Sequence, residues 1–327
     1  MTNLETKYMG LTLKNPIIIA SSGLTNSVDR IKDLERAGAG AVVLKSIFEE
    51  QINNEVLHLI NRDPQTLYPE NEDFIWNYTR NNSITRHLNL LSEVKKETEI
   101  PVIASINCMS ASEWVMFAKN FENAGADALE LNLFFVPTDP YKSSEEIEQL
   151  YLKIVSSVKQ NTTIPISVKI GYNYTNLLEF AGQLTKSGAD ALVLFNRFYE
   201  PDIDIEKLEL SSSEIFSSPA DMRRFLRWTG LISSQLPNVQ IAASTGIHDS
   251  EAVIKQLLAG AQVTQICSTV YINGSQVIAG MVNDLNDFMK KWNFKTIADF
   301  RGKLSYKNVP DPMLYERAQF MKYFAVK

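Results

Sequence analysis

The phrase Ala37-Gly38-Ala39-Gly40-Ala41-Val42-Val43-Leu44 recurs with small changes at residues 124–131, 187–194 and 259–266. Each copy follows a stretch of helical period and runs into a short, mostly apolar strand. Glycine accepts the left-handed conformation that ends a helix, and small neighbours let the chain turn back closely into a strand. The repeat therefore predicts a series of helix-to-strand units.

Other strands begin after a proline, at Pro16, Pro101 and Pro165, because proline can start a strand without losing a ladder hydrogen bond. The two kinds of start together predict eight strands: Ile17–Ser21, Ala41–Ser46, Val102–Asn107, Ala128–Leu133, Ile166–Ile170, Ala191–Asn196, Gln240–Thr245 and Val263–Ser268. Most of these strands are continuously apolar, as strands that are covered on both faces should be.

Strands that alternate with helices indicate an α/β protein with a parallel sheet, and eight similar units favour closure into a (β/α)8 or TIM barrel. An open, doubly wound sheet is the alternative. The 327 residues suit one such domain over residues 1–327. A polar insertion at about residues 48–89, a second irregular stretch at 197–219 and a tail from about Asp287 depart from the repeat. We expect the two long loops to shape the active site or a subunit contact.

The composition is that of an ordinary globular protein, with 45% hydrophobic and 21% charged residues and a net charge of −6. The charges are well mixed, which argues against a nucleic-acid partner. Cys108 and Cys267 are the only cysteines, so neither a disulfide framework nor a cysteine-ligated metal site is expected. The apolar runs are strand-sized and the first ten residues are polar, so we expect a cytoplasmic protein without a membrane partner.

Chemistry in a barrel of this kind takes place just past the C-terminal ends of the strands. Those positions carry small, hydroxyl, amide and cationic side chains, without histidine or clustered carboxylates. A metal hydrolase or a two-carboxylate glycosidase would need such groups, so both classes are excluded and no metal is expected. The histidines His58, His87 and His248 fall in connections and are interpreted as surface or helix residues.

Two lysines, Lys45 and Lys169, and three asparagines at the strand ends suit a planar ligand that gains negative charge. A flavin has this character, because reduction places charge near N1 and O2 of its ring. The loops after the last two strands are where such barrels often bind a phosphate through backbone N–H groups. A phosphate-binding aldolase that uses Lys169 as a Schiff-base amine is a weaker alternative.

Several of these segments together resemble the dihydroorotate dehydrogenase family, most closely its soluble branch, and the resemblance covers nearly the whole chain. The matching segments are Asn15 to Gly23, Lys45-Ser46, Glu130-Leu131-Asn132-Leu133, Val168-Lys169, Ser244-Thr245-Gly246-Ile247, Gln265 to Thr269 and Phe300 to Leu304.

The resemblance implies an FMN-dependent dehydrogenase that passes a hydride between the flavin and dihydroorotate or a related small carboxylated substrate, in pyrimidine biosynthesis if the substrate is dihydroorotate. It also implies a homodimer. Lys45 and Lys169 would act on the charge of the flavin. The residues implied to bind FMN are Ala20, Ser21, Lys45, Ser46, Asn107, Asn132, Lys169, Asn196, Thr245, Gly246, Ser268 and Thr269.

The substrate side departs from the family pattern. Phe135 stands where the family has the cysteine or serine that takes a proton from the substrate carbon, and general-base catalysis contributes a factor of about 10²–10⁴. The replacements we consider are Cys108, Thr138 or a tyrosine of the long loop. A flavin-binding protein without dihydroorotate dehydrogenase activity is the alternative function.

The family's substrate-binding phrase in the long loop is also incomplete, because the stretch from Asn77 to Asn82 lacks its glycine. Arg197 replaces a smaller serine or threonine, and an arginine could clamp a carboxylate in a bidentate pair. An anionic small molecule is therefore the expected substrate. The residues expected to bind it are Asn77, Asn132, Asn196 and Arg197.

Overall fold

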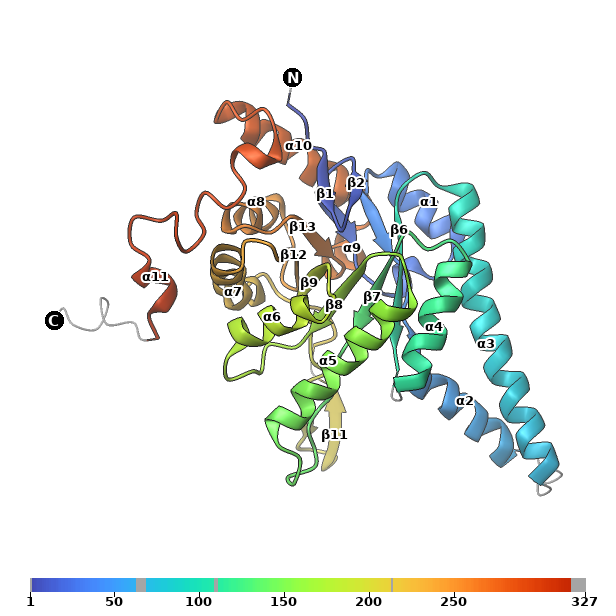
Figure 1. Cartoon of the computed structure of the whole chain (residues 1–327). Coiled ribbons are helices and arrows are strands. Elements are labelled where there is room, and N and C mark those ends of the chain that lie inside the picture. The colour runs from blue at the N-terminus through green and yellow to red at the C-terminus, as the bar shows by residue number, and fades with distance from the viewer. Residues whose placement is uncertain (1, 63–68, 109–110, 213, 319–327) are drawn as a thin grey trace.

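Eight parallel strands hydrogen-bond side by side in a closed ring. Figure 1 shows the computed structural model of the chain, with helices around these strands. In ring order they are β3 (Ile17–Ile19), β4 (Ala41–Val43), β6 (Val102–Asn107), β7 (Ala128–Asn132), β8 (Ile166–Ile170), β9 (Ala191–Leu194), β12 (Gln240–Ser244) and β13 (Val263–Ile266). The structure describes residues 2–62, 69–108, 111–212 and 214–318, with only the backbone for 59–62, 69–77 and 111.

The last strand closes the ring by pairing with the first, since Gln265 of β13 lies opposite Ile18 of β3. The TIM barrel is thereby confirmed and the open sheet is wrong. Every strand begins at the predicted residue, and several end earlier because the polar residues at the rim leave the hydrogen-bonded ladder. The short strand β5 (Ile47–Phe48) adds to the C-terminal end of β6.

Helices cover the outside of the ring. They are α1 (Val28–Arg36), α4 (Ala111–Asn123), α5 (Ser144–Asn161), α6 (Leu177–Lys186), α7 (Asp221–Gln235), α8 (Ser250–Ala259) and α10 (Gln276–Lys291). Four of the turns back into the sheet use the glycine of the repeated phrase in a positive-φ conformation, from 95° to 120°, at Gly38, Gly125, Gly188 and Gly260. The helix-to-strand interpretation of the repeat is therefore correct.

The insertion at 48–89 is helical and not an irregular loop. It forms α2 (Glu49–Arg62) and the first part of α3 (Pro69–Glu97), which pack on each other. Ile52 and Val56 lie four residues apart on α2 and are buried, and Ile84, Leu91 and Val94 of α3 are buried as well. Four-residue spacing places side chains on one face of a helix, so a sparse apolar stripe holds together a segment whose average composition is polar.

A small hairpin closes the N-terminal end of the barrel. It consists of β1 (Thr6–Tyr8) and β2 (Leu11–Leu13). Its Tyr8, Met9 and Leu13 form one buried cluster with inward-facing strand residues such as Ala128 and Ala242. The hairpin and α2 lie at opposite ends of the molecule (Figure 1), so the hairpin covers the end of the barrel opposite the C-terminal rim.

The tail lies against the outside of the barrel. Helix α10 continues to Lys291, and the following chain is anchored by Phe300, which is fully buried. The backbone N–H groups of Gly302 and Leu304 donate to the carbonyls at the end of α8. The short helix α11 (Met313–Glu316) then packs on α7. Among the described residues no helix is both long and apolar enough to cross a membrane.

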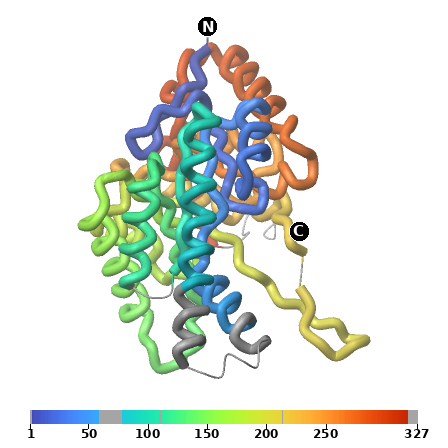
Figure 2. Tube along the Cα trace, turned by 90° about the vertical axis from the view of Figure 1, so that its right-hand side faces the viewer, coloured from blue at the N-terminus to red at the C-terminus, as the bar shows by residue number. Residues whose placement is uncertain are grey.

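The second irregular stretch forms an antiparallel hairpin, β10 (Pro201–Asp204) and β11 (Glu209–Ser212). Figure 2 shows it, in yellow, standing away from the barrel. The chain then returns to the rim, where the backbone N–H of Ser217 donates to Oγ of Ser268 at 3.1 Å. This segment is therefore an arm that reaches out and comes back across the C-terminal end of the barrel.

Candidate functional site

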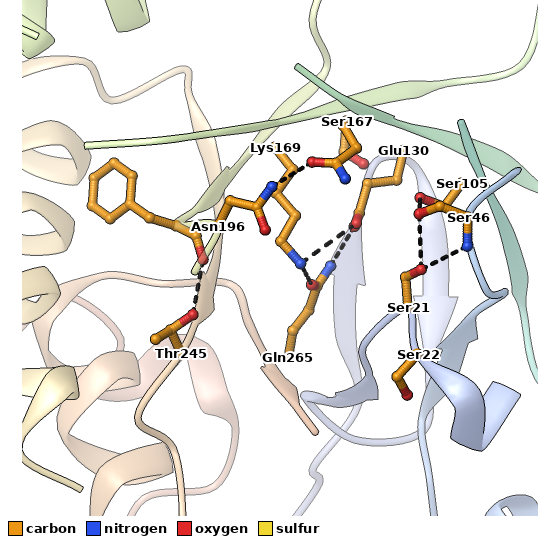
Figure 3. A network of polar contacts seen from close by, with 12 residues as sticks. Ser21, Ser22, Ser46, Ser105, Glu130, Ser167, Lys169, Asn196, Thr245 and Gln265 are labelled. Carbon is orange, nitrogen blue, oxygen red and sulfur yellow. Dashed lines mark hydrogen bonds and ion pairs between the residues drawn. The ribbon is translucent and has the colours of Figure 1, made fainter. Parts of the chain in front are cut away.

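A buried charged network occupies the top of the barrel interior (Figure 3). Gln265 of β13 donates from Nε2 to Oε2 of Glu130 on β7 at 2.6 Å. Lys169 of β8 donates from Nζ to Oε1 of Gln265 at 3.5 Å and lies 3.8 Å from Oε1 of Glu130. Lys169 is 8% exposed, Gln265 2% and Glu130 1%. Buried charges require such pairing, so the three side chains hold one another in place.

Three asparagines from neighbouring strands form a second network beside the first. Asn196, which follows β9, donates from Nδ2 to Oδ1 of Asn132 at 2.6 Å. Asn107, at the end of β6, donates to the backbone carbonyl of Asn132 at 2.8 Å. Asn107 and Asn132 end the adjacent strands β6 and β7, and Asn196 reaches Asn132 from β9, on the other side of β8. Asn132 is thus fixed from both sides.

Hydroxyl groups connect the first two strand ends. Ser21 and Ser46 are joined at 2.9 Å between their Oγ atoms, and the N–H of Ser46 donates to Oγ of Ser21, also at 2.9 Å. Ser46 is in turn 2.6 Å from Oγ of Ser105 on β6 (Figure 3). Ser105 was not predicted, because an inward-facing serine in an apolar strand carries no signal of its own.

The loop after β12 has room for no side chain at its second position, Gly246. Thr245 and Gly246 have φ values of 72° and 78°. A Cβ on Gly246 would lie 2.2 Å from the backbone nitrogen of Met222 in α7. The hydroxyl of Thr245 donates to the carbonyl of Phe195 at 3.0 Å. The loop is therefore held rigidly against α7 and β9.

The loop after β13 leads directly into the short helix α9 (Ser268–Asn273), whose N-cap Cys267 makes no side-chain cap. Its Ser268 is 3.1 Å from the hydroxyl of Ser217, and that hydroxyl is 3.0 Å from Nε2 of His248. His248, which was predicted to be a surface or helix residue, is half-buried and contacts the rim through Ser217. Ser217 and His248 could not have been found from the sequence, because a distant arm brings them together.

These groups line one cavity of about 180 Å³ at the mouth of the barrel. Seven of the residues predicted to bind a cofactor line it: Ala20, Ser21, Lys169, Asn196, Thr245, Gly246 and Ser268. Four other predicted residues do not line the cavity but are hydrogen-bonded to residues at the rim: Ser46, Asn107, Asn132 and Thr269. The bond of Thr269 is to the carbonyl of His248. The remaining lining residues are Arg197, Ile215, Ser217, Ser244, Ile247, Gln265 and Cys267.

Lys45 lies apart from Lys169, although the two were expected to act together. Its Nζ is 5.7 Å from the ring centre of Phe48, and its side chain lines a second cavity of about 360 Å³ against α2 and α3. Arg86 and His87 line the same cavity. Ser21 lines the cavity of Lys169 and Ser46 lines the cavity of Lys45, and the contact between their hydroxyls connects the two cavities. The structure thus divides the predicted cationic pair between neighbouring cavities.

The predicted substrate residues are not all brought together. Arg197 lines the cavity of Lys169, but its guanidinium donates to the backbone carbonyls of Glu214 (2.6 Å) and Ile215. These bonds hold the arm against the rim. The guanidinium therefore binds backbone carbonyls in this structure and not, as predicted, a carboxylate. Asn77 belongs to α3, and its side chain lies outside the described residues.

Phe135, at the position predicted for a general base, packs against another aromatic ring. The ring of Phe135 stacks on Tyr151 of α5 with 5.3 Å between centroids, and its backbone N–H donates to the Tyr151 hydroxyl at 3.1 Å. Cys108 is fully buried, and burial together with Glu49 and Glu113 raises the pKa of its thiol. A thiol that stays protonated is a poor base, so the geometry does not favour Cys108 as a replacement.

Two rim histidines make the stability of the chain depend on pH. Burial holds the pKa of His87 and of His248 below the ordinary value of 6.5. The unfolded chain therefore takes up protons first as the pH falls through about 6.5, and stability declines. We expect a lower free energy of unfolding at about pH 5.5 than at about pH 7.5. In urea unfolding, H87N and H248N should lose less of this free energy between the two pH values than the unaltered chain does. H58N, which changes an exposed histidine, should lose as much as the unaltered chain.

The fold and the rim together define a (β/α)8 barrel with a polar ligand site at the carboxyl ends of its strands. The family model for dihydroorotate dehydrogenase matches residues 3–289, so the chain belongs to the dihydroorotate dehydrogenase family.

Curated relatives agree at modest identity. Two proteins named "Dihydroorotate dehydrogenase B (NAD(+)), catalytic subunit" match over 92% of this chain with 28% identity. That of Thermoplasma volcanium is covered over 98% of its length and that of Thermoplasma acidophilum over 99%. The protein of the same name from Methanothermobacter thermautotrophicus is also 28% identical, over 91% of this chain and 97% of its own.

Proposed function

We propose that the chain is an FMN-dependent oxidoreductase with the flavin at the carboxyl ends of the strands. The observation that carries the proposal is the buried ammonium of Lys169, which Glu130 and Gln265 hold at a cavity rich in small and hydroxyl side chains. Small residues such as Ala20, Ser21 and Ser244 leave room for a planar ring there. The residues present therefore fit the group.

The phosphate of FMN would lie at the loops after β12 and β13. Gly246 and Ser268 line the cavity there, and the N-cap residue of α9, Cys267, makes no side-chain cap to the first N–H groups of that helix. Such N–H groups bind phosphate oxygens. This placement supports the seven lining residues as cofactor ligands. Lys45 is a weaker candidate for a cofactor ligand, because it lines the other cavity.

Bound FMN would supply the hydride acceptor. Around it, Lys169 would hold a positive charge beside the part of the ring that becomes negative on reduction. Asn196, held by Asn132, would orient a small substrate whose CH–CH group gives up the hydride. The Lys45 ammonium has no carboxylate partner among the ion pairs of the described side chains, whereas Arg86 in the same cavity pairs with Glu55 at 3.6 Å. Lys45 would therefore be the group that stabilises an anionic group of the substrate there.

The substrate we propose is dihydroorotate or a related small carboxylated molecule, which would place the protein in pyrimidine biosynthesis in the first case. Phe135 supports the second candidate function, a flavin-binding protein that does not oxidise dihydroorotate. Its ring is packed on Tyr151 and cannot accept a proton. A homodimer in the cytoplasm remains our prediction for the assembled protein.

One spectral titration separates the two functions. The purified chain should be yellow with a flavin spectrum, and anaerobic dihydroorotate should bleach it. A flavin spectrum that dihydroorotate leaves unchanged, while dithionite bleaches it, would favour the second function. A colourless protein that does not take up added FMN would contradict both.

A further inference from the structure

An aromatic cavity of about 210 Å³ lies beside the rim and outside the site described above. It is formed where the chain leaves β7 and β8 and where α5 begins. Five of its lining residues carry aromatic rings: Phe134, Phe135, Tyr151, Tyr174 and Phe198.

The rings come from two packed groups. On one side, Phe134 and Phe198 lie 4.3 Å apart between centroids. On the other side, Phe135 stacks on Tyr151, and Tyr174 stacks on Phe180 of α6 at 4.4 Å. These contacts fix the rings, so the cavity is preformed.

Gly171, at the end of β8, lets the first group of rings approach the barrel. A Cβ at this position would lie 3.1 Å from the ring of Phe198 and 3.8 Å from that of Phe134. The absence of a side chain therefore lets both rings pack directly over the strand end, and this packing forms one side of the cavity.

The only charged side chain among the lining residues is an acid, Glu148. Burial and the neighbouring carboxylates of Glu179 and Glu145 raise the pKa of Glu148, and no cation is among the causes. The positive end of the α5 dipole lies close by, but Glu145 and Glu146 stand in its first turn and offset it. The cavity therefore combines aromatic rings with the carboxylate of Glu148, which makes no ion pair among the described side chains.

We propose that this cavity binds a small organic cation, such as a quaternary or methylated ammonium group. Ring faces attract cations through their quadrupole, and aromatic cages are the usual means of recognising quaternary ammonium. The carboxylate of Glu148 would add a direct charge interaction. An anion would be repelled by the same carboxylates, and a neutral ligand would leave them uncompensated. The site is independent of the proposed flavin function, because no cofactor-binding residue lines it.

Choline and its uncharged isostere, in which carbon replaces the quaternary nitrogen, test the proposal by isothermal titration calorimetry on the purified full-length chain. We expect choline to bind and the isostere to bind about five- to thirty-fold more weakly, the range expected for loss of a cation–π contact. Equal binding of the two, or no binding of choline at millimolar concentration, overturns the proposal. The readout does not require flavin, so its failure is distinct from failure of the proposed function.

Variants locate the binding. E148Q should weaken choline binding and leave binding of the isostere unchanged, whereas E99Q, which alters an exposed carboxylate at the opposite end of the barrel, should change neither. Y174L should weaken both ligands, and Y199L, which removes an exposed ring outside the cavity, should weaken neither. Circular dichroism of each variant checks folding. Choline binding that survives both E148Q and Y174L contradicts the assignment to this cavity.

Discussion

The K169A variant should lose about 10²–10³-fold in the rate at which substrate reduces the flavin. Lys169 and Arg197 are the cations that line the cavity, but the guanidinium of Arg197 is bonded to backbone carbonyls. The ammonium of Lys169 is held by Glu130 and Gln265. Without it, the negative charge of the reduced ring would meet the carboxylate of Glu130. Anaerobic stopped-flow spectroscopy of flavin bleaching measures this rate, and a redox titration should show a more negative flavin potential.

Two controls accompany that experiment. K186A removes an exposed lysine from α6 and should behave as the unaltered chain. K169R keeps the charge and should retain the potential better than K169A, even if its larger guanidinium fits the cavity poorly. A K169A protein that keeps both its potential and its rate would contradict the role given to Lys169. Loss of flavin altogether would support binding by Lys169 and not the electrostatic role.

The Q265L variant should lower the free energy of unfolding by about 3 kcal/mol. Gln265 is the only hydrogen-bond donor to Oε2 of Glu130 among the described residues, and both side chains are almost fully buried. Leucine has a similar volume but leaves a carboxylate oxygen without a partner in the barrel interior, and an unpaired buried charge is strongly destabilising. Urea denaturation followed by circular dichroism gives the loss.

A double-mutant cycle identifies the cause. E130Q with Q265L removes the charge together with its partner, so the double variant should lose less than the sum of the two single losses. Q160L changes an exposed glutamine at the end of α5 and should have little effect. Additive losses would show that Gln265 stabilises the barrel by packing and not by satisfying Glu130.

The fold could be predicted from the sequence because its signals are local. A glycine such as Gly38 or Gly260 ends a helix through its own backbone conformation, and the apolar residues that follow start a strand whatever else the chain does. The insertion at 48–89 was misread as a loop, since its apolar stripe at Ile52, Val56 and Ile84 is too sparse to change the average composition.

The cofactor side of the site was predictable for a related reason. In a parallel barrel all strands end on one rim, so Lys169, Asn196 and Gly246 meet in one cavity although they are far apart in the chain. The direction in which a side chain at the rim points could not be predicted in this way. Lys45 also follows its strand, but the two helices after it form a second cavity that its side chain lines instead.

By itself, then, the sequence determined the barrel, its rim and the polar groups placed there, because each depends on residues close to one another in the chain. Only the tertiary structure decided how these groups pair. Gln265 bridges Glu130 and Lys169 across the barrel axis, and Ser217 arrives at the rim from an outlying arm. The rings around Phe135 likewise form a cavity only when α5 packs beside β7. Such contacts depend on packing between distant segments, and no local pattern encodes them.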